Sequence, residues 1–173
     1  MTIIGDALKK AGIQADEKNI NSDEKIKITI ETKIGYMKKH IDNIQRLVDK
    51  YFRVQGDEQE EADVISALNN HFIYMAEAFK DILNGIRKKE CGNELASLRE
   101  GVRYFNSIAE TDSLDAALET LIDRNDLAHK YEMYEAVSQK TLRNCISYAA
   151  DYKKICKLIY DYCKANGIID GKS

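Results

Sequence analysis

The chain has 173 residues, of which 26 are basic and 29 acidic, with 9 glycines and no proline. This scarcity of turn-forming residues excludes collagen-like and low-complexity classes and argues against an all-β sandwich or barrel. The formal charge of −3 gives no overall attraction for polyanions, so binding of nucleic acid would need a local basic patch. We therefore predict an all-α protein, an up-and-down bundle of about five helices.

The first long helix is predicted from a capping signal and an apolar stripe. Residues 1–20 are expected to form a lead-in segment and residues 21–173 the helical bundle. Residues 21–24 resemble a capping box and open a segment that extends to about Val54. Residues 25–30 also alternate as a strand does, but no partner strand is evident, so a helix is favoured. The stripe of this helix consists of Ile30, Ile34, Met37, Ile41, Ile44, Val48 and Tyr51.

A second stripe with the same spacing follows Gly56 and extends to Lys89. It predicts a second long helix that pairs with the first as an antiparallel hairpin. The acidic residues 57–61 fit the first turn of this helix, where they complement its dipole. Gly92 predicts its end, and Asn93 the N-cap of the next helix. The stripe consists of Ile65, Leu68, Phe72, Met75, Phe79, Ile82 and Ile86.

Three further helices complete the predicted bundle. Residues 111–113 mark the start of the fourth helix, and Gly167 ends the last one. Two helices of this length are long for a small domain. The alternative that part of a stripe packs on a second copy, as a homodimer, therefore remains open. The apolar positions are Leu95, Leu98, Val102 and Phe105 in the third helix, Leu114, Ala117, Leu118 and Leu121 in the fourth, and Leu142, Cys145, Ala149, Tyr152, Cys156, Ile159 and Cys163 in the last.

The cysteines show no C-x-x-C spacing and are expected to be reduced core side chains, not zinc ligands or disulfides. They are Cys91, Cys145, Cys156 and Cys163. His40 and His71 are expected at solvent or interface positions, not as ligands. No apolar run reaches the roughly 18 residues of a membrane helix, and the first residues lack a secretory leader. We therefore expect a cytoplasmic protein with no membrane partner.

One short stretch carries candidate chemistry. Residues 121–132 contain Arg124, His129 and Tyr131 in the pattern R-x4-H-x-Y. Imidazole titrates near neutral pH and is suited to general acid/base catalysis, which makes His129 the candidate for moving a proton. A guanidinium donates to two phosphoryl oxygens in a fixed geometry, so Arg124 is the candidate for stabilising charge on a phosphate.

The spacing of the pair limits how it can act. On one continuous helix, five residues separate Arg124 from His129 by roughly 140°. The two groups converge most easily if Arg124 lies at a helix boundary, if its side chain wraps around the helix, or if two copies face each other. Asn125 and Lys130 are candidate supporting residues, for orientation and for attraction to a nucleic-acid backbone. For Tyr131, a core or interface position is the alternative to a functional one.

This stretch resembles the signature of the HEPN superfamily of all-helical domains, which has the form R-x4-6-H with a polar residue after the arginine. Arg124, Asn125 and His129 match that signature. Tyr131 matches the version found in HEPN toxins that are paired with a minimal nucleotidyltransferase, and in the related nucleotidyltransferase substrate-binding proteins. The expected order of helices is similar too, whereas the extra length at the N-terminus departs from the family pattern.

The resemblance implies a metal-independent endoribonuclease that acts as a toxin or defence effector. It implies RNA as the substrate, no cofactor and no metal, and a cleft formed by two subunits that is lined by Arg124 and His129 of both. It also implies a partner nucleotidyltransferase, the antitoxin, that transfers AMP to Tyr131. The alternative within the same superfamily is a non-catalytic binding module that docks such a nucleotidyltransferase or binds nucleotide.

Overall fold

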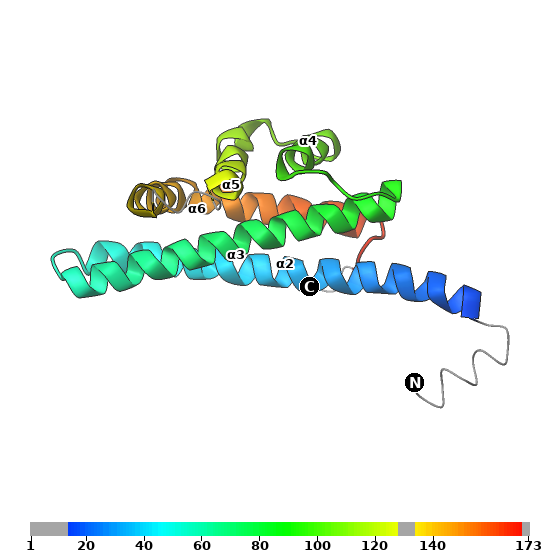
Figure 1. Ribbon diagram of the computed structural model, residues 1–173, viewed down its shortest axis with the longest axis horizontal. Coiled ribbons are helices and arrows are strands. Elements are labelled where there is room, and N and C mark those ends of the chain that lie inside the picture. Colours follow the sequence, from blue (N-terminus) through cyan, green and yellow to red (C-terminus); the bar gives the residue numbers. More distant parts are fainter. Residues whose placement is uncertain (1–13, 128–133, 171–173) are drawn as a thin grey trace, which may run out of the picture.

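The regular structure of the chain is helical throughout the described part. The structure, a computed structural model, describes residues 14–127 and 134–170, with side chains for residues 22–123 and 139–170 (Figure 1). The prediction of an all-α bundle with two long N-terminal helices is confirmed. The elements are α2 (Gln14–Arg53), α3 (Glu58–Cys91), α4 (Leu98–Ile108), a 3₁₀ turn (Asp112–Leu114), α5 (Asp115–Leu127) and α6 (Tyr134–Ala165).

Helices α2 and α3 form the predicted antiparallel hairpin, and α6 packs against both of them. The short helices α4 and α5 lie together on one side of α3, and α5 also contacts α6 (Figure 1). The core is thus enclosed between the hairpin and the C-terminal half of the chain. Its largest fully buried side chains include Ile30, Met37, Ile41, Ile44, Leu68, Phe72, Met75, Phe79, Ile82, Leu83, Phe105 and Tyr152.

Near the turn of the hairpin, the buried positions differ by one residue from the predicted stripes. Leu47 and Val64 are buried, whereas Val48 and Ile65 are only half-buried. A helix has 3.6 residues per turn, so a stripe that repeats every seven residues drifts around a straight helix. The stripes therefore predict the face that is buried but not every residue along it.

The ends of α3 follow the predicted signals. The Asp57 carboxylate accepts a hydrogen bond from the backbone N–H of Glu60 at 3.2 Å and caps the helix. The acidic first turn is therefore where the sequence predicts it. At the other end Gly92 adopts a φ of 77°, which favours glycine, and its N–H donates to the carbonyl oxygen of Lys88 at 3.0 Å.

The predicted N-cap of α4 is wrong. Asn93 does not cap the helix, because its Oδ1 accepts a hydrogen bond from Nε of Arg87 at 3.0 Å. Ser97 is the N-cap, and its Oγ accepts from the backbone N–H of Glu100 at 3.1 Å. A serine followed three residues later by glutamate is itself a capping signal, and it outweighs an asparagine that lies too far upstream.

The predicted start of the first helix also differs from the structure. Helix α2 begins at Gln14 and continues through residues 21–24. A capping signal marks the first turn of a helix only where the residues before it disfavour helical structure. The residues before it, 14–20, contain no glycine or proline, and asparagine or serine inside a helix costs only a fraction of 1 kcal/mol.

The C-terminal end of the described chain returns to the first half of α2. Gly167, with a φ of 67°, ends the helical part as predicted. Ile168 and Ile169 are buried, and the Asp170 carboxylate pairs with the Lys27 ammonium. None of the described helices contains a stretch that is both long and apolar enough to cross a membrane.

Candidate functional site

The R-x4-H-x-Y stretch lies at the junction of α5 and α6. The backbone of Arg124 and Asn125 belongs to the last part of α5. The side chains of both, and the whole of His129, Lys130 and Tyr131, lie outside the described residues. The structure thus gives the two helices that flank the candidate catalytic residues, while the convergence of these residues stays a prediction.

Helix α5 is anchored on the core immediately before the motif. Leu118 and Leu121, which belong to the predicted apolar stripe of this helix, are buried, and so is Ile122. The next residue, Asp123, forms an ion pair with Lys140 of α6, with 3.6 Å between the carboxylate and the ammonium. Since both side chains are partly exposed, this pair contributes at most about 1 kcal/mol, but it links the two flanking helices directly beside the motif.

A buried hydrogen bond joins the same two helices more firmly. Thr120 of α5 donates its hydroxyl proton to the carbonyl oxygen of Ala117 at 2.6 Å. Its oxygen must therefore accept the proton of the Tyr152 hydroxyl of α6, 2.7 Å away. The Tyr152 ring also lies 5.7 Å from that of Phe72 in α3, between ring centroids. Three helices thus meet at Tyr152, and burial raises the pKa of its hydroxyl.

Replacing Tyr152 with phenylalanine is expected to lower the free energy of unfolding by about 1–1.5 kcal/mol, because the ring is kept and one buried hydrogen bond is lost. Urea denaturation measures the change. Tyr36→Phe is the matched control, since Tyr36 is 50% exposed and its replacement should have almost no effect. Equal stability of both variants would contradict a buried link between α5 and α6.

Three of the four cysteines are core side chains, as predicted. Cys145, Cys156 and Cys163 are buried, and burial raises the pKa of the Cys156 thiol to about 11 and that of Cys163 to about 12. Their thiols therefore stay protonated at neutral pH and are poor nucleophiles. The prediction is wrong for Cys91, which is exposed. Cys91 is the last residue of α3 and follows Ile86, the last buried residue of that helix, by more than one turn.

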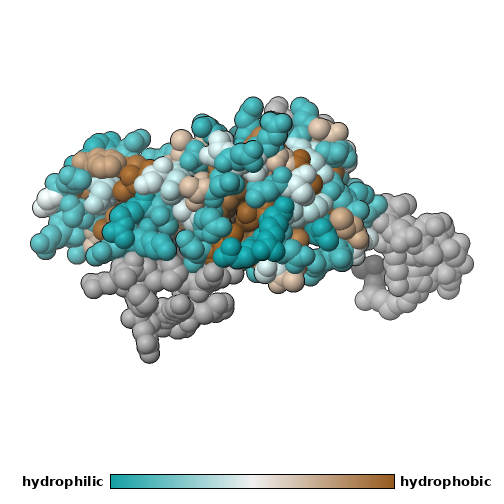
Figure 2. All heavy atoms as spheres, turned by 90° about the horizontal axis from the view of Figure 1, so that it is seen from above, coloured by the Kyte–Doolittle hydropathy of each residue, from teal (hydrophilic) through white to brown (hydrophobic). Residues whose placement is uncertain are grey.

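Two groups of basic side chains, residues 87–89 of α3 and Lys153, Lys154 and Lys157 of α6, are largely exposed and partly paired with carboxylates. Lys89 pairs with Asp23 at 3.2 Å, and the Arg87 guanidinium lies 5.0 Å from the centroid of the Tyr104 ring. On the face of the molecule shown in Figure 2, hydrophilic residues cover most of the described surface, and apolar ones appear in its middle and near its left end. These basic side chains lie beside carboxylates, so they provide local surface charge and not a continuous basic patch.

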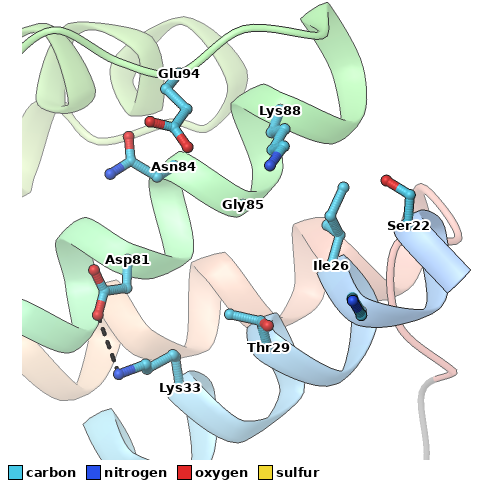
Figure 3. A pocket seen from close by; sticks show the side chains of 10 residues that line it. Ser22, Ile26, Thr29, Lys33, Asp81, Asn84, Gly85, Lys88 and Glu94 are labelled. Carbon is cyan, nitrogen blue, oxygen red and sulfur yellow. Dashed lines mark ion pairs between the residues drawn. The ribbon is translucent and has the colours of Figure 1, made fainter. Parts of the chain in front are cut away.

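A cleft that was not predicted from the sequence lies between the first half of α2 and the second half of α3 (Figure 3). It has a volume of about 380 Å³, and the Lys33–Asp81 ion pair of 3.1 Å lies within its lining. Gly85 lets the helices approach here, because a Cβ at this position would come within 2.7 Å of Cγ1 of Ile30. The described residues that line the cleft come from α2, α3 and the segment that follows α3.

Two histidines that the sequence analysis placed at solvent or interface positions contact each other. His40 of α2 and His71 of α3 are half-buried, with 2.9 Å between their Nδ1 atoms. A signal for this contact is present in the sequence, because the two residues are equally far from the middle of the hairpin turn. Nowhere in the described chain, this pair included, is a group of three or more histidine, cysteine or acidic residues arranged to hold a metal ion.

Comparisons of the chain with models of protein families, with curated proteins and with solved structures find no match. The R-x4-H-x-Y motif, in the chain between α5 and α6, is thus the feature that bears on function.

Proposed function

We propose that this chain is a HEPN-like, metal-independent endoribonuclease that acts in the cytoplasm as a toxin or defence effector. The observation that carries the proposal is the R-x4-H-x-Y motif of Arg124, His129 and Tyr131. The all-α bundle supports it, since two long N-terminal helices precede the motif and a long helix follows it, as the HEPN resemblance implies.

In this mechanism the 2′-hydroxyl of one nucleotide attacks the adjacent phosphorus, and the bond to the 5′-oxygen of the next nucleotide breaks. His129 either removes the proton from the 2′-hydroxyl while water protonates the leaving 5′-oxygen, or protonates the leaving 5′-oxygen while water takes up the proton of the 2′-hydroxyl. Arg124 donates to the phosphoryl oxygens on which negative charge builds. The products are a 2′,3′-cyclic phosphate and a 5′-hydroxyl, so no metal-bound water is required.

The proposed site belongs to a homodimer in which two motifs line one cleft. Two copies double the local positive charge of Arg124 and Lys130, which offsets the net charge of −3 on each chain toward RNA. Asn125 orients the phosphate or the imidazole. On one continuous helix the spacing keeps Arg124 and His129 on different sides. In the dimer, Arg124 of one subunit can meet His129 of the other.

The experiment that tests the proposal is incubation of the purified chain with RNA in excess EDTA. We expect fragments that end in 2′,3′-cyclic phosphate, because the chemistry needs only the imidazole and the guanidinium. Absence of cleavage by the dimeric protein, with or without added Mg²⁺, would contradict the nuclease proposal.

Tyr131 is proposed as the target of a partner nucleotidyltransferase, the antitoxin. Transfer of AMP to its hydroxyl would add negative charge and bulk beside a cleft that binds an anionic substrate. After co-expression with a minimal nucleotidyltransferase, mass spectrometry should find added AMP on the peptide that contains Tyr131, and RNA cleavage should be lost. A Tyr131→Phe chain should remain unmodified and active. Modification at other residues only would contradict this role.

The net negative charge favours a second candidate, a non-catalytic HEPN module that docks a nucleotidyltransferase or binds nucleotide. It predicts a stable complex with the transferase that does not depend on His129, and no RNA cleavage. The EDTA experiment therefore separates the two functions.

A further inference from the structure

His40 and His71 come from opposite arms of the α2–α3 hairpin and meet on its surface. Their ring centroids are 5.2 Å apart, with 46° between the ring planes. No other described side chain hydrogen-bonds to either ring. In the neutral state one Nδ1–H donates to the lone pair of the other Nδ1. If the donor ring carries its proton on Nε2 instead, both Nδ1 lone pairs become free without any net loss of protons.

The two nitrogens lie close enough together for both to bind one metal ion. Metal–imidazole bonds are about 2.0–2.1 Å long, so two nitrogens 2.9 Å apart subtend an angle of about 90° at a shared metal ion. A tetrahedral ion would require the nitrogens to be about 3.3 Å apart. An angle near 90° is typical of the tetragonal geometry that Cu²⁺ and Ni²⁺ adopt with nitrogen and oxygen ligands.

We propose that His40 and His71 form a two-histidine site for a divalent transition metal, Cu²⁺ or Ni²⁺, that bridges α2 and α3. Water completes the coordination, because the half-buried rings are reached from solvent. The site contains two protein ligands, fewer than the three-residue clusters that are absent from the described chain. The site uses no residue of the R-x4-H-x-Y motif and does not depend on the proposed nuclease activity.

The surroundings of the pair favour a fixed but moderate site. The Tyr74 ring lies beside the His40 ring, with 5.4 Å between their centroids. Lys39 and Arg46 are the nearby cations and oppose a bound metal ion. Both are exposed, so solvent and salt weaken their repulsion, whereas the bonds to the imidazole nitrogens form at short range.

Metal binding to the full chain tests this proposal. The protein is purified without a histidine tag, stripped with EDTA, dialysed and titrated with NiCl2 in a calorimeter. We expect one site per chain, and a loss of affinity of at least about tenfold in His40→Ala and in His71→Ala, since each variant removes one arm of a chelate. His129→Ala is the matched control and should bind Ni²⁺ as the unaltered chain does. Circular dichroism verifies that each variant is folded.

Two further readouts distinguish a bridging metal from loose surface binding. The EPR spectrum of one equivalent of Cu²⁺ should show coupling to two imidazoles in the unaltered chain and to one in His71→Ala. Ni²⁺ should raise the Tm of the unaltered chain but not that of either variant, because the bridge exists only in the folded hairpin. Absence of binding, equal affinity in all chains, or loss of binding only in His129→Ala would each overturn the proposal.

Discussion

Replacing His129 with alanine is expected to reduce the rate of RNA cleavage by about 10²–10⁴-fold, because a positioned general acid or base contributes about that much to a reaction. Initial rates of cleavage of a labelled RNA in EDTA measure the effect. The thermal unfolding of the variant should remain close to that of the unaltered chain. Undiminished cleavage would remove His129 from the mechanism.

The companion substitution Arg124→Ala should lower the rate by about 10²–10³-fold, the typical loss when one group that stabilises transition-state charge is removed. Arg124→Lys should recover only part of the rate, since lysine keeps the charge but lacks the paired donors of the guanidinium. Arg103→Ala is a matched control, because Arg103 is an exposed arginine of α4 that is not part of the motif. Equal losses in Arg103→Ala and Arg124→Ala would indicate a general charge effect.

The largest expected effect on stability is that of Phe79→Ala, which should lower the free energy of unfolding by about 3–5 kcal/mol. Phe79 of α3 is fully buried, and its ring contacts that of Phe105 in α4 edge to face, with 5.9 Å between centroids. Alanine would leave a cavity where the hairpin meets the short helices. Urea denaturation followed by circular dichroism measures the loss.

Phe52→Ala is the control for this substitution, because Phe52 is 57% exposed near the end of α2. It should change the free energy of unfolding by less than about 0.5 kcal/mol. If the two phenylalanine variants lose similar stability, the assignment of the buried face of α3 is wrong.

Much of the fold follows from local patterns that do not need tertiary information. The apolar spacing from Ile30 to Ile44 predicts both the helix and its buried face, because each turn repeats the same geometry. The errors fall at helix ends, where several signals compete. Ser97 caps α4 in place of Asn93, and α2 continues through residues 21–24. Small differences in free energy decide such boundaries, and residue type alone does not resolve them.

The candidate site is less predictable than the fold, for a physical reason. A motif shows which groups are available, whereas catalysis depends on where Arg124 and His129 lie relative to one phosphodiester, within a fraction of an ångström. The proposed cleft also needs a second subunit, which no periodicity within one chain specifies. The contact between His40 and His71, in contrast, could have been predicted from the sequence alone. The two histidines are equally far from the hairpin turn, and an antiparallel helical hairpin brings such positions together.

The most direct measurement uses a short oligonucleotide in which one nucleotide keeps its ribose and all others carry 2′-deoxyribose. It is incubated with the chain in EDTA. Attack by a neighbouring hydroxyl, assisted by imidazole and guanidinium, predicts a single cut at the remaining ribose. The 5′ fragment should end in a cyclic phosphate, and His129→Ala should leave the strand intact. Cleavage at deoxyribose linkages, or a requirement for divalent metal, would contradict the mechanism.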